Sequence, residues 1–194
     1  MNVNETSVNS SPTYSFGWPD ADERLRELII YIASRCEQDR YFGATKLNKI
    51  LWHADVAAFA FYGKPITGVA YQRLNQGPAP KKLLPIKNRM LVDGDILERR
   101  PQLGQRRQHR IIPLREPNLD LFTARDIAVV DEVISALWDK NAGEVSTLSH
   151  MCGWHVAANG ELIPYEAIFL SDEPVTEYDV QRARELMCEH DVDL

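Results

Sequence analysis

Apolar residues recur along this chain mainly at the three- and four-residue spacing of helices that bury one face. The clearest run lies between residues 47 and 61 and contains Leu47, Ile50, Leu51, Ala54, Ala57, Ala58 and Phe61. Gly63 and Pro65 follow this run, and glycine and proline commonly end a helix. The pattern predicts a strongly amphipathic helix that ends at about residue 63.

Capping pairs predict where three other helices begin. These pairs are Asp20 with Glu23, Thr123 with Asp126, and Thr176 with Asp179. We expect the apolar residues behind each cap to be buried: Leu25, Leu28, Ile29, Ile32, Ala33 and Cys36 in the first helix, Ile127, Val130, Ile134, Leu137 and Trp138 in the second, and Val180, Ala183 and Met187 in the third. Shorter helices are expected at 81–91, where Pro85 delays or kinks the helix, and at 146–157.

Two segments favour β-structure. Bulky and small side chains alternate over 69–74, which predicts a short strand, and Gly-Pro-Ala-Pro at 77–80 predicts a turn that starts the next helix. Segments 96–99 and 110–114 flank a polar loop, which predicts a β-hairpin at about 95–114. Two arginine pairs are expected to face each other near its tip, Arg99-Arg100 and Arg106-Arg107.

These elements together predict a mainly α fold of the α+β class. We expect a compact bundle of about five to six helices with a short strand and a small antiparallel β-hairpin. Residues 19–194 are expected to form a single domain. Residues 1–18 are rich in Asn, Ser and Thr and show no periodicity, which predicts a disordered N-terminal tail.

The net charge of −6 is unevenly distributed. Residues 81–115 carry 10 basic and 3 acidic side chains, whereas residues 116–194 carry 4 basic and 17 acidic ones. A basic block can mark a nucleic-acid surface. The acidic remainder would repel phosphate, so solvated faces or contact with the acidic helices explain the block more simply. Like charges facing each other across a hairpin are unfavourable without an anionic partner, which makes these four arginines candidate partner contacts.

Composition excludes some protein classes. No apolar run reaches the ~20 residues that span a bilayer, and the N-terminus lacks the basic and apolar regions of a secretory signal. Cys36, Cys152 and Cys188 form no C-x-x-C motif, which predicts reduced thiols rather than a zinc site or disulfides. We therefore expect a cytoplasmic protein without membrane contact.

No catalytic motif stands out. His150, Cys152 and His155 lie close in sequence, but the two histidines are not spaced to share a helix face, and no carboxylate lies between them. His53 and Asp55 point to different sides of the predicted helix. Nucleophile-elbow, P-loop and dinucleotide-binding motifs are all missing. We expect no enzymatic activity, no metal and no cofactor.

The segment 46–80 resembles the Panacea antitoxin domain family of SocA-like, phage-associated proteins. The family pattern K-L-x-K-[LI]-L-[YW]-x-A, followed by G-x-P and G-P-x-x-P, is matched by Lys46, Leu47, Lys49, Ile50, Leu51, Trp52 and Ala54, then by Tyr62, Gly63, Pro65, Ile66, Tyr71, Gly77 and Pro78, and one place off by Pro80. A later patch fits with a collapsed spacing through Leu148, Ser149, His150, Trp154, Ile163, Pro164, Glu166 and Ile168. The resemblance covers about residues 24–170.

The resemblance implies an antitoxin of a type II toxin–antitoxin system that binds and neutralises a cognate toxin protein. It also implies a possible second role as an adaptor or chaperone that delivers the toxin to a cytosolic protease. The motif residues, His150 included, are expected to serve the fold, and Trp154 is a further candidate contact. The alternative is a nucleic-acid-binding regulator that uses the basic region 81–115, although no convincing helix-turn-helix pair accompanies it.

Overall fold

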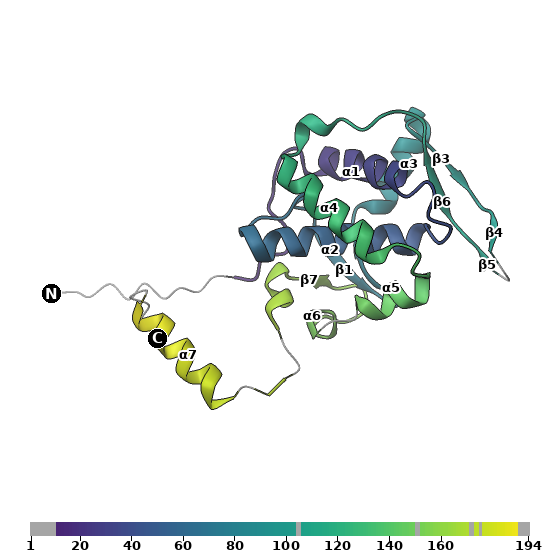
Figure 1. Cartoon of the computed structure of the whole chain (residues 1–194). Helices are drawn as coiled ribbons and strands as arrows, with labels where there is room; N and C mark the ends of the chain where they lie inside the picture. Colours follow the sequence, from purple (N-terminus) through teal and green to yellow (C-terminus); the bar gives the residue numbers. More distant parts are fainter. Residues whose placement is uncertain (1–10, 104–105, 150–151, 171–172, 175, 190–194) are drawn as a thin grey trace.

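The computed structural model describes residues 11–103, 106–149, 152–170, 173–174 and 176–189. The long helix α2 (Ala44–Tyr62) lies at the centre of the domain (Figure 1). It contacts α1 (Ala21–Arg35), α4 (Ala124–Leu137), α5 (Ala142–Leu148) and a small antiparallel sheet. The expected mainly helical α+β fold is confirmed.

Helix α2 is central because several elements cover its apolar stripe. Five of the predicted stripe residues are at most 1 % exposed: Leu47, Ile50, Leu51, Ala54 and Ala58. Gly63 ends the helix in the left-handed conformation (φ 69°), as the sequence predicts. The prediction that Phe61 is buried is wrong, because the stripe leaves the core in the last turn and Phe61 is 76 % exposed.

Most residues predicted to form the apolar faces of α1 and α4, the helices at either side of α2, are buried. All six predicted residues of α1 are buried, and in α4 Val130, Ile134 and Leu137 are buried. Trp138 is 37 % exposed because α4 ends before it. These two faces and the stripe of α2 form the hydrophobic core.

Side chains cap the N-termini of α4 and α5, the first two α-helices that follow the hairpin in the sequence. Thr123 and Asp126 form the predicted capping box at α4, and Asn141 and Glu144 form an unpredicted one at α5. Asp20 precedes α1, but its side chain does not cap the helix. Its backbone (φ −96°, ψ 7°) lacks the extended conformation that a capping side chain requires.

The sheet has the order β2-β1-β7, with β1 (Tyr71–Leu74) between β2 (Gly77–Pro80) and β7 (Leu162–Ile163). The prediction of a turn at 77–80 is wrong, because this segment pairs antiparallel with β1. Two prolines are tolerated there since β2 is an edge strand and needs no amide on its outer side. Helix α3 (Leu83–Asp93) follows, with Pro85 in its first turn.

The predicted hairpin is confirmed as a projecting arm, defined here as residues 96–113 (Figure 1). Strands β3 (Ile96–Arg99) and β6 (Arg110–Pro113) form its inner part, and β4 (Gln102–Leu103) and β5 (Arg106–Arg107) form its outer part. The prediction that Arg99-Arg100 face Arg106-Arg107 is wrong, because the strands pair in another register. Arg99 faces Arg110, whereas Arg106 and Arg107 face Leu103 and Gln102.

The N-terminal segment is partly ordered on the domain, so the predicted tail is too long. The Phe16 amide donates to Gly68 O at 3.0 Å, and the Phe16 ring lies 5.4 Å from the Tyr165 ring. Thr13 O accepts from the Tyr165 amide at 2.9 Å. Aromatic packing therefore fixes residues 13–18, which composition alone did not indicate. Residues 1–10 lie outside the described part.

The C-terminal third is less regular than predicted. The helix expected at 146–157 is divided into α5 and α6 (Cys152–His155), followed by β7 and the 3-10 helix η2 (Tyr165–Phe169). A second 3-10 helix, η1 (Leu119–Leu121), precedes α4. Helix α7 (Glu177–Glu189) has the predicted cap, because the Asp179 amide donates to Thr176 Oγ1 at 3.2 Å.

Helix α7 lies apart from the domain (Figure 1). The predicted burial of Val180 is wrong, since this side chain is 40 % exposed. The side chains of Ala183 and Met187 lie outside the described part. In the described residues, no helix is long and apolar enough to span a bilayer.

Candidate partner-binding site

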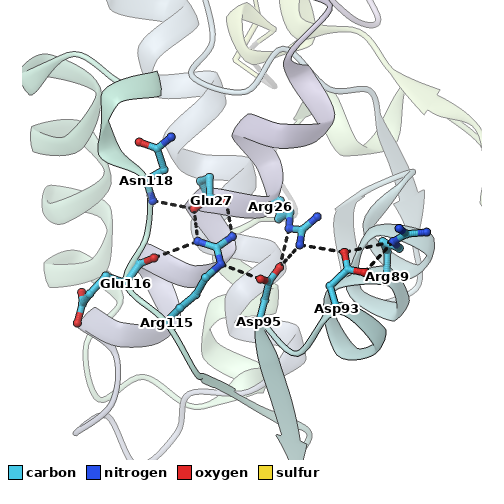
Figure 2. A network of polar contacts seen from close by, with 8 residues as sticks. All are labelled: Arg26, Glu27, Arg89, Asp93, Asp95, Arg115, Glu116 and Asn118. Carbon is cyan, nitrogen blue, oxygen red and sulfur yellow. Dashed lines mark hydrogen bonds and ion pairs between the residues drawn. The ribbon is translucent and has the colours of Figure 1, made fainter.

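A network of ion pairs holds the base of the arm against α1 (Figure 2). Asp95 precedes β3, Arg115 follows β6, and Arg115 Nε donates to Asp95 Oδ1 at 2.7 Å. Arg115 Nη1 also donates to Glu27 Oε2 of α1 at 2.7 Å. From the same helix, Arg26 Nε donates to Asp95 Oδ2 at 2.6 Å. Both ends of the arm are therefore tied to one helix.

The two buried carboxylates of this network stay ionised because cations surround them. Burial alone would raise the pKa of Glu27, but hydrogen bonds from Arg115 and from the Asn118 amide hold it below its usual range. Burial opposes ionisation of Asp95 too, and hydrogen bonds from Arg115 and Arg26 lower its pKa. Alternating charges thus stabilise the base of the arm.

The loop between α1 and α2 supports the arm further out. Arg110 donates to the carbonyl oxygens of Asp39 at 2.8 Å and Cys36 at 3.0 Å, just beyond the C-terminus of α1. A cation is favoured there by the unpaired carbonyls of the helix. A Cβ atom on Gly43 would lie 2.8 Å from Gln108 Cγ, so glycine allows the arm to pack directly on the start of α2.

A polar pocket of about 440 Å³ lies between the arm, the start of α2 and the start of α5. Its cationic side chains are Lys46 and Arg107, and His109 also lines it. None of the described lining residues carries a carboxylate. Lys46 is neutralised by Asp39 at 2.6 Å, whereas no described carboxylate pairs with Arg107. The polar pocket therefore presents uncompensated positive charge.

An apolar pocket of about 250 Å³ adjoins the polar pocket, and both are lined by Ala44 and His109. Leu83 and Leu84 of α3 contribute to its lining. Asn48 lines it as well, and among the described residues no group hydrogen-bonds to the buried Asn48 Oδ1. A ligand with an aliphatic side chain would match the apolar lining.

The structure separates the candidate arginines by environment. Arg99 and Arg100 are exposed at the end of β3, and Arg107 is exposed at the polar pocket. Arg106 lies in β5, but its side chain is outside the described part. Of the candidate arginines, Arg107 lines the polar pocket.

Trp154 lies away from the arm, on α6. Its indole Nε1 donates to Leu74 O at 3.3 Å, at the end of β1. The Arg73 guanidinium lies 3.9 Å from its ring centre, which is a cation–π arrangement. Trp154 is half-buried, so part of its surface could still meet a partner.

The motif lysines are buried, which the sequence did not reveal. Lys46 and Lys49 are each 1 % exposed. Lys49 Nζ donates to Pro78 O at 3.0 Å and so joins α2 to β2. Burial lowers the pKa of Lys49 to about 7. Gly77 is required beside it, because a Cβ there would lie 2.5 Å from Lys49 Nζ.

Asp55 is a second buried junction that sequence reasoning missed. Its carboxylate accepts from the amides of Ile66 at 2.8 Å and Thr67 at 2.7 Å and from Tyr71 Oη at 2.8 Å. Tyr165 Oη, nearby, donates to Val69 O at 2.8 Å. The only available signal was a lone acidic residue within an apolar helical stripe. These contacts tie α2 to the segment leading into β1.

The described histidines do not belong to a metal-binding cluster. Among the described residues, no three His, Cys, Asp or Glu side chains are grouped so that they could hold a metal ion. His150 lies outside the described part. His53 is largely buried, and burial, followed by the charge of Lys49, lowers its pKa to about 4. His53 is thus neutral near pH 7.

Comparison with known proteins bears on the whole of this region. The family model described as "Antitoxin SocA-like, Panacea domain" matches residues 47–155. No curated protein and no solved structure matches the chain. The matched span is more than half of the chain and includes most of α2, the whole arm and most of the residues that line the two pockets. The chain therefore belongs to the SocA-like antitoxin family that carries the Panacea domain.

Proposed function

We propose that this protein is an antitoxin that binds and neutralises a cognate toxin protein in the cytoplasm, without catalysis of its own. The family match over residues 47–155 carries the proposal. The arm and its two pockets support it, because they offer a supported, projecting surface with uncompensated positive charge. Protein partners often recognise such surfaces by charge complementarity.

Co-expression with the product of the neighbouring gene tests this function. Expression of that product alone should stop growth, and the full-length protein should restore it. A matched plasmid with an early stop codon in this chain serves as the control. The two proteins should also copurify. Continued toxicity in the presence of the intact protein would overturn the proposal.

The route of neutralisation has two forms, blocking and delivery to a cytosolic protease. Blocking leaves the toxin stable in cells, whereas an adaptor shortens its lifetime. Toxin half-life after translation arrest, measured with and without this chain, separates them. We propose blocking as the primary route, because the supported arm is suited to holding a partner, and unchanged half-life during full neutralisation would agree with it.

A nucleic-acid-binding regulator is the second candidate, favoured by the exposed arginines Arg99, Arg100 and Arg107 on the arm. Backbone contacts alone would give weak binding that falls steeply with salt. A gel shift with the upstream DNA at ~150 mM salt therefore decides. A sequence-specific shift of the DNA that persists at this salt would favour the regulator. Absence of such a shift would favour the antitoxin.

A further inference from the structure

The polar and apolar pockets adjoin where the arm packs on the start of α2, because both are lined by Ala44 and His109, and together they are called the groove here. The shared wall is fixed by the backbone: the Ala44 amide donates to His109 O at 2.9 Å. Gln108 Nε2 donates to Arg40 O at 3.2 Å on the same side. The groove is thus supported before any partner arrives, which lowers the cost of binding.

The polar end of the groove favours an anionic group. Arg107 is exposed there, and no carboxylate among the described residues pairs with it. The described lining of the polar pocket contains no Asp or Glu, and Glu98, which lines the adjoining apolar pocket, is paired with Lys87 at 3.3 Å. A carboxylate would match the planar Arg107 guanidinium, which can donate two parallel hydrogen bonds in a bidentate pair.

The apolar end of the groove favours an aliphatic side chain. Leu84 lines it and is 63 % exposed, so a partner side chain would remove apolar surface from water. Leu83 and Ile111 line it as well, so that side chain would pack against further aliphatic groups.

We infer that this groove binds an extended acidic segment of the toxin, with a carboxylate at Arg107 and an aliphatic side chain against Leu84. The inference rests on the proposed function, since it names the chemistry of the toxin's contact. A nucleic acid fits less well. Its charge at every nucleotide would be repelled by a chain of net charge −6. The apolar end also offers no aromatic platform apart from His109 on which bases could stack.

Peptide display on the immobilised full-length protein tests the inference. A random twelve-residue library, selected at ~150 mM salt, should enrich peptides with Asp or Glu within about four residues of Leu, Ile or Val. The most enriched peptide is then labelled with fluorescein and titrated by anisotropy. Enrichment without acidic residues, or no enrichment at all, would overturn the inference.

Three substitutions locate the binding. Arg107→Glu and Leu84→Asp should each raise the Kd of that peptide about tenfold or more. Lys64→Glu is the matched control, because Lys64 is exposed beyond the far end of α2, about 28 Å from its start. This control should change the Kd by less than about twofold. Both groove residues are exposed, so circular dichroism should show native folding in all three variants.

Unchanged binding by Arg107→Glu, or an equal loss in Lys64→Glu, contradicts the inference. Displacement of the peptide by an equal concentration of a thymidine 20-mer does so as well, since the groove would then be a nucleic-acid site. The growth assay distinguishes failure of the proposed groove from failure of the proposed antitoxin function. Full neutralisation by Arg107→Glu and Leu84→Asp would overturn the groove and leave the antitoxin function standing. Failure of the wild-type protein to neutralise would overturn the function, while the peptide titration decides the groove.

Discussion

Two motif glycines, Gly63 and Gly77, have positive φ angles but different surroundings. A Cβ on Gly77 (φ 96°) would lie 2.4 Å from Ser149 Oγ, whereas one on Gly63 (φ 69°) would have no heavy atom within 4 Å. Gly63→Ala should lower the free energy of unfolding by about 1 kcal/mol through backbone strain alone. Gly77→Ala should cost roughly 1–3 kcal/mol more, because overpacking adds to strain. Urea unfolding measures both, and equal losses would show that the site at Gly77 relaxes.

The buried Lys49 gives a pH-dependent prediction. Its pKa is lowered from 10.5 to about 7 by burial. Between these values the unfolded chain binds the proton more tightly than the folded one, so the free energy of unfolding rises with pH. Lys49→Met should remove this rise. The difference between wild type and variant, measured by urea unfolding from about pH 7 to about pH 10, should increase with pH. A difference independent of pH would contradict the assignment.

At the scale of elements, the base of the arm depends on Arg115. Arg115→Met leaves the buried carboxylates of Glu27 and Asp95 without a partner that both share and should cost about 2 kcal/mol near neutral pH. In the wild type, both carboxylates bind protons less readily when folded, because their pKa values are lowered. Their contribution is therefore present above their ordinary pKa values and is lost as pH falls through the lower folded values.

Comparison of the two proteins across acid pH measures this contribution. Thermal unfolding at about pH 7 and about pH 3 should show a smaller acid loss in Arg115→Met than in the wild type. Arg125→Met is the control, because Arg125 is exposed and forms no ion pair with a described carboxylate. An equal acid loss in all three proteins would show that the network contributes nothing.

The arginines of the arm, taken as one element, should contribute to partner capture. Replacement of Arg99, Arg100, Arg106 and Arg107 by Ser should weaken toxin binding and flatten its salt dependence, because the arm loses its positive field. Lys64→Ser with Arg125→Ser removes two exposed cations at the other end of α2 and should leave both unchanged. Titrations of toxin binding at about 50 and about 300 mM salt measure both the affinity and its salt dependence. Unchanged binding by the arm variant would exclude the arm from the interface.

For the whole molecule, local signals predicted the elements and failed on contacts between them. Helices α2 and α4 were predictable because periodicity, a glycine stop and a capping box act within one turn. Strand β2 was not, because its prolines suggest a turn and only pairing with β1 makes it a strand. The division between α5 and α6 was missed for the same reason, since α6 is held by a tertiary contact in which Trp154 Nε1 donates to the Leu74 carbonyl oxygen of β1.

The candidate site was harder to predict than the fold. The arm's arginines were visible in the sequence as a charge cluster. The groove was not, because its lining residues Ala44, Leu84 and Arg107 come from three separate elements. The buried acceptor Asp55 and its donor Thr67 are 12 positions apart, and no local pattern links them. Chemistry that depends on tertiary contact leaves little trace in a single sequence.

Helix α7 shows how far the domain extends. Its described side chains are exposed, and it lies apart from the core (Figure 1). Removal of residues 171–194 should therefore change the melting temperature by less than about 2 °C, since the described side chains of this segment are exposed and bury little apolar surface. Circular dichroism on the truncated and full-length proteins measures this. A fall of more than about 4 °C would mean that α7 packs on the domain in solution. Because an exposed amphipathic helix is stabilised mainly by what covers it, a truncated protein that is equally stable but binds toxin less tightly would place α7 in the interface.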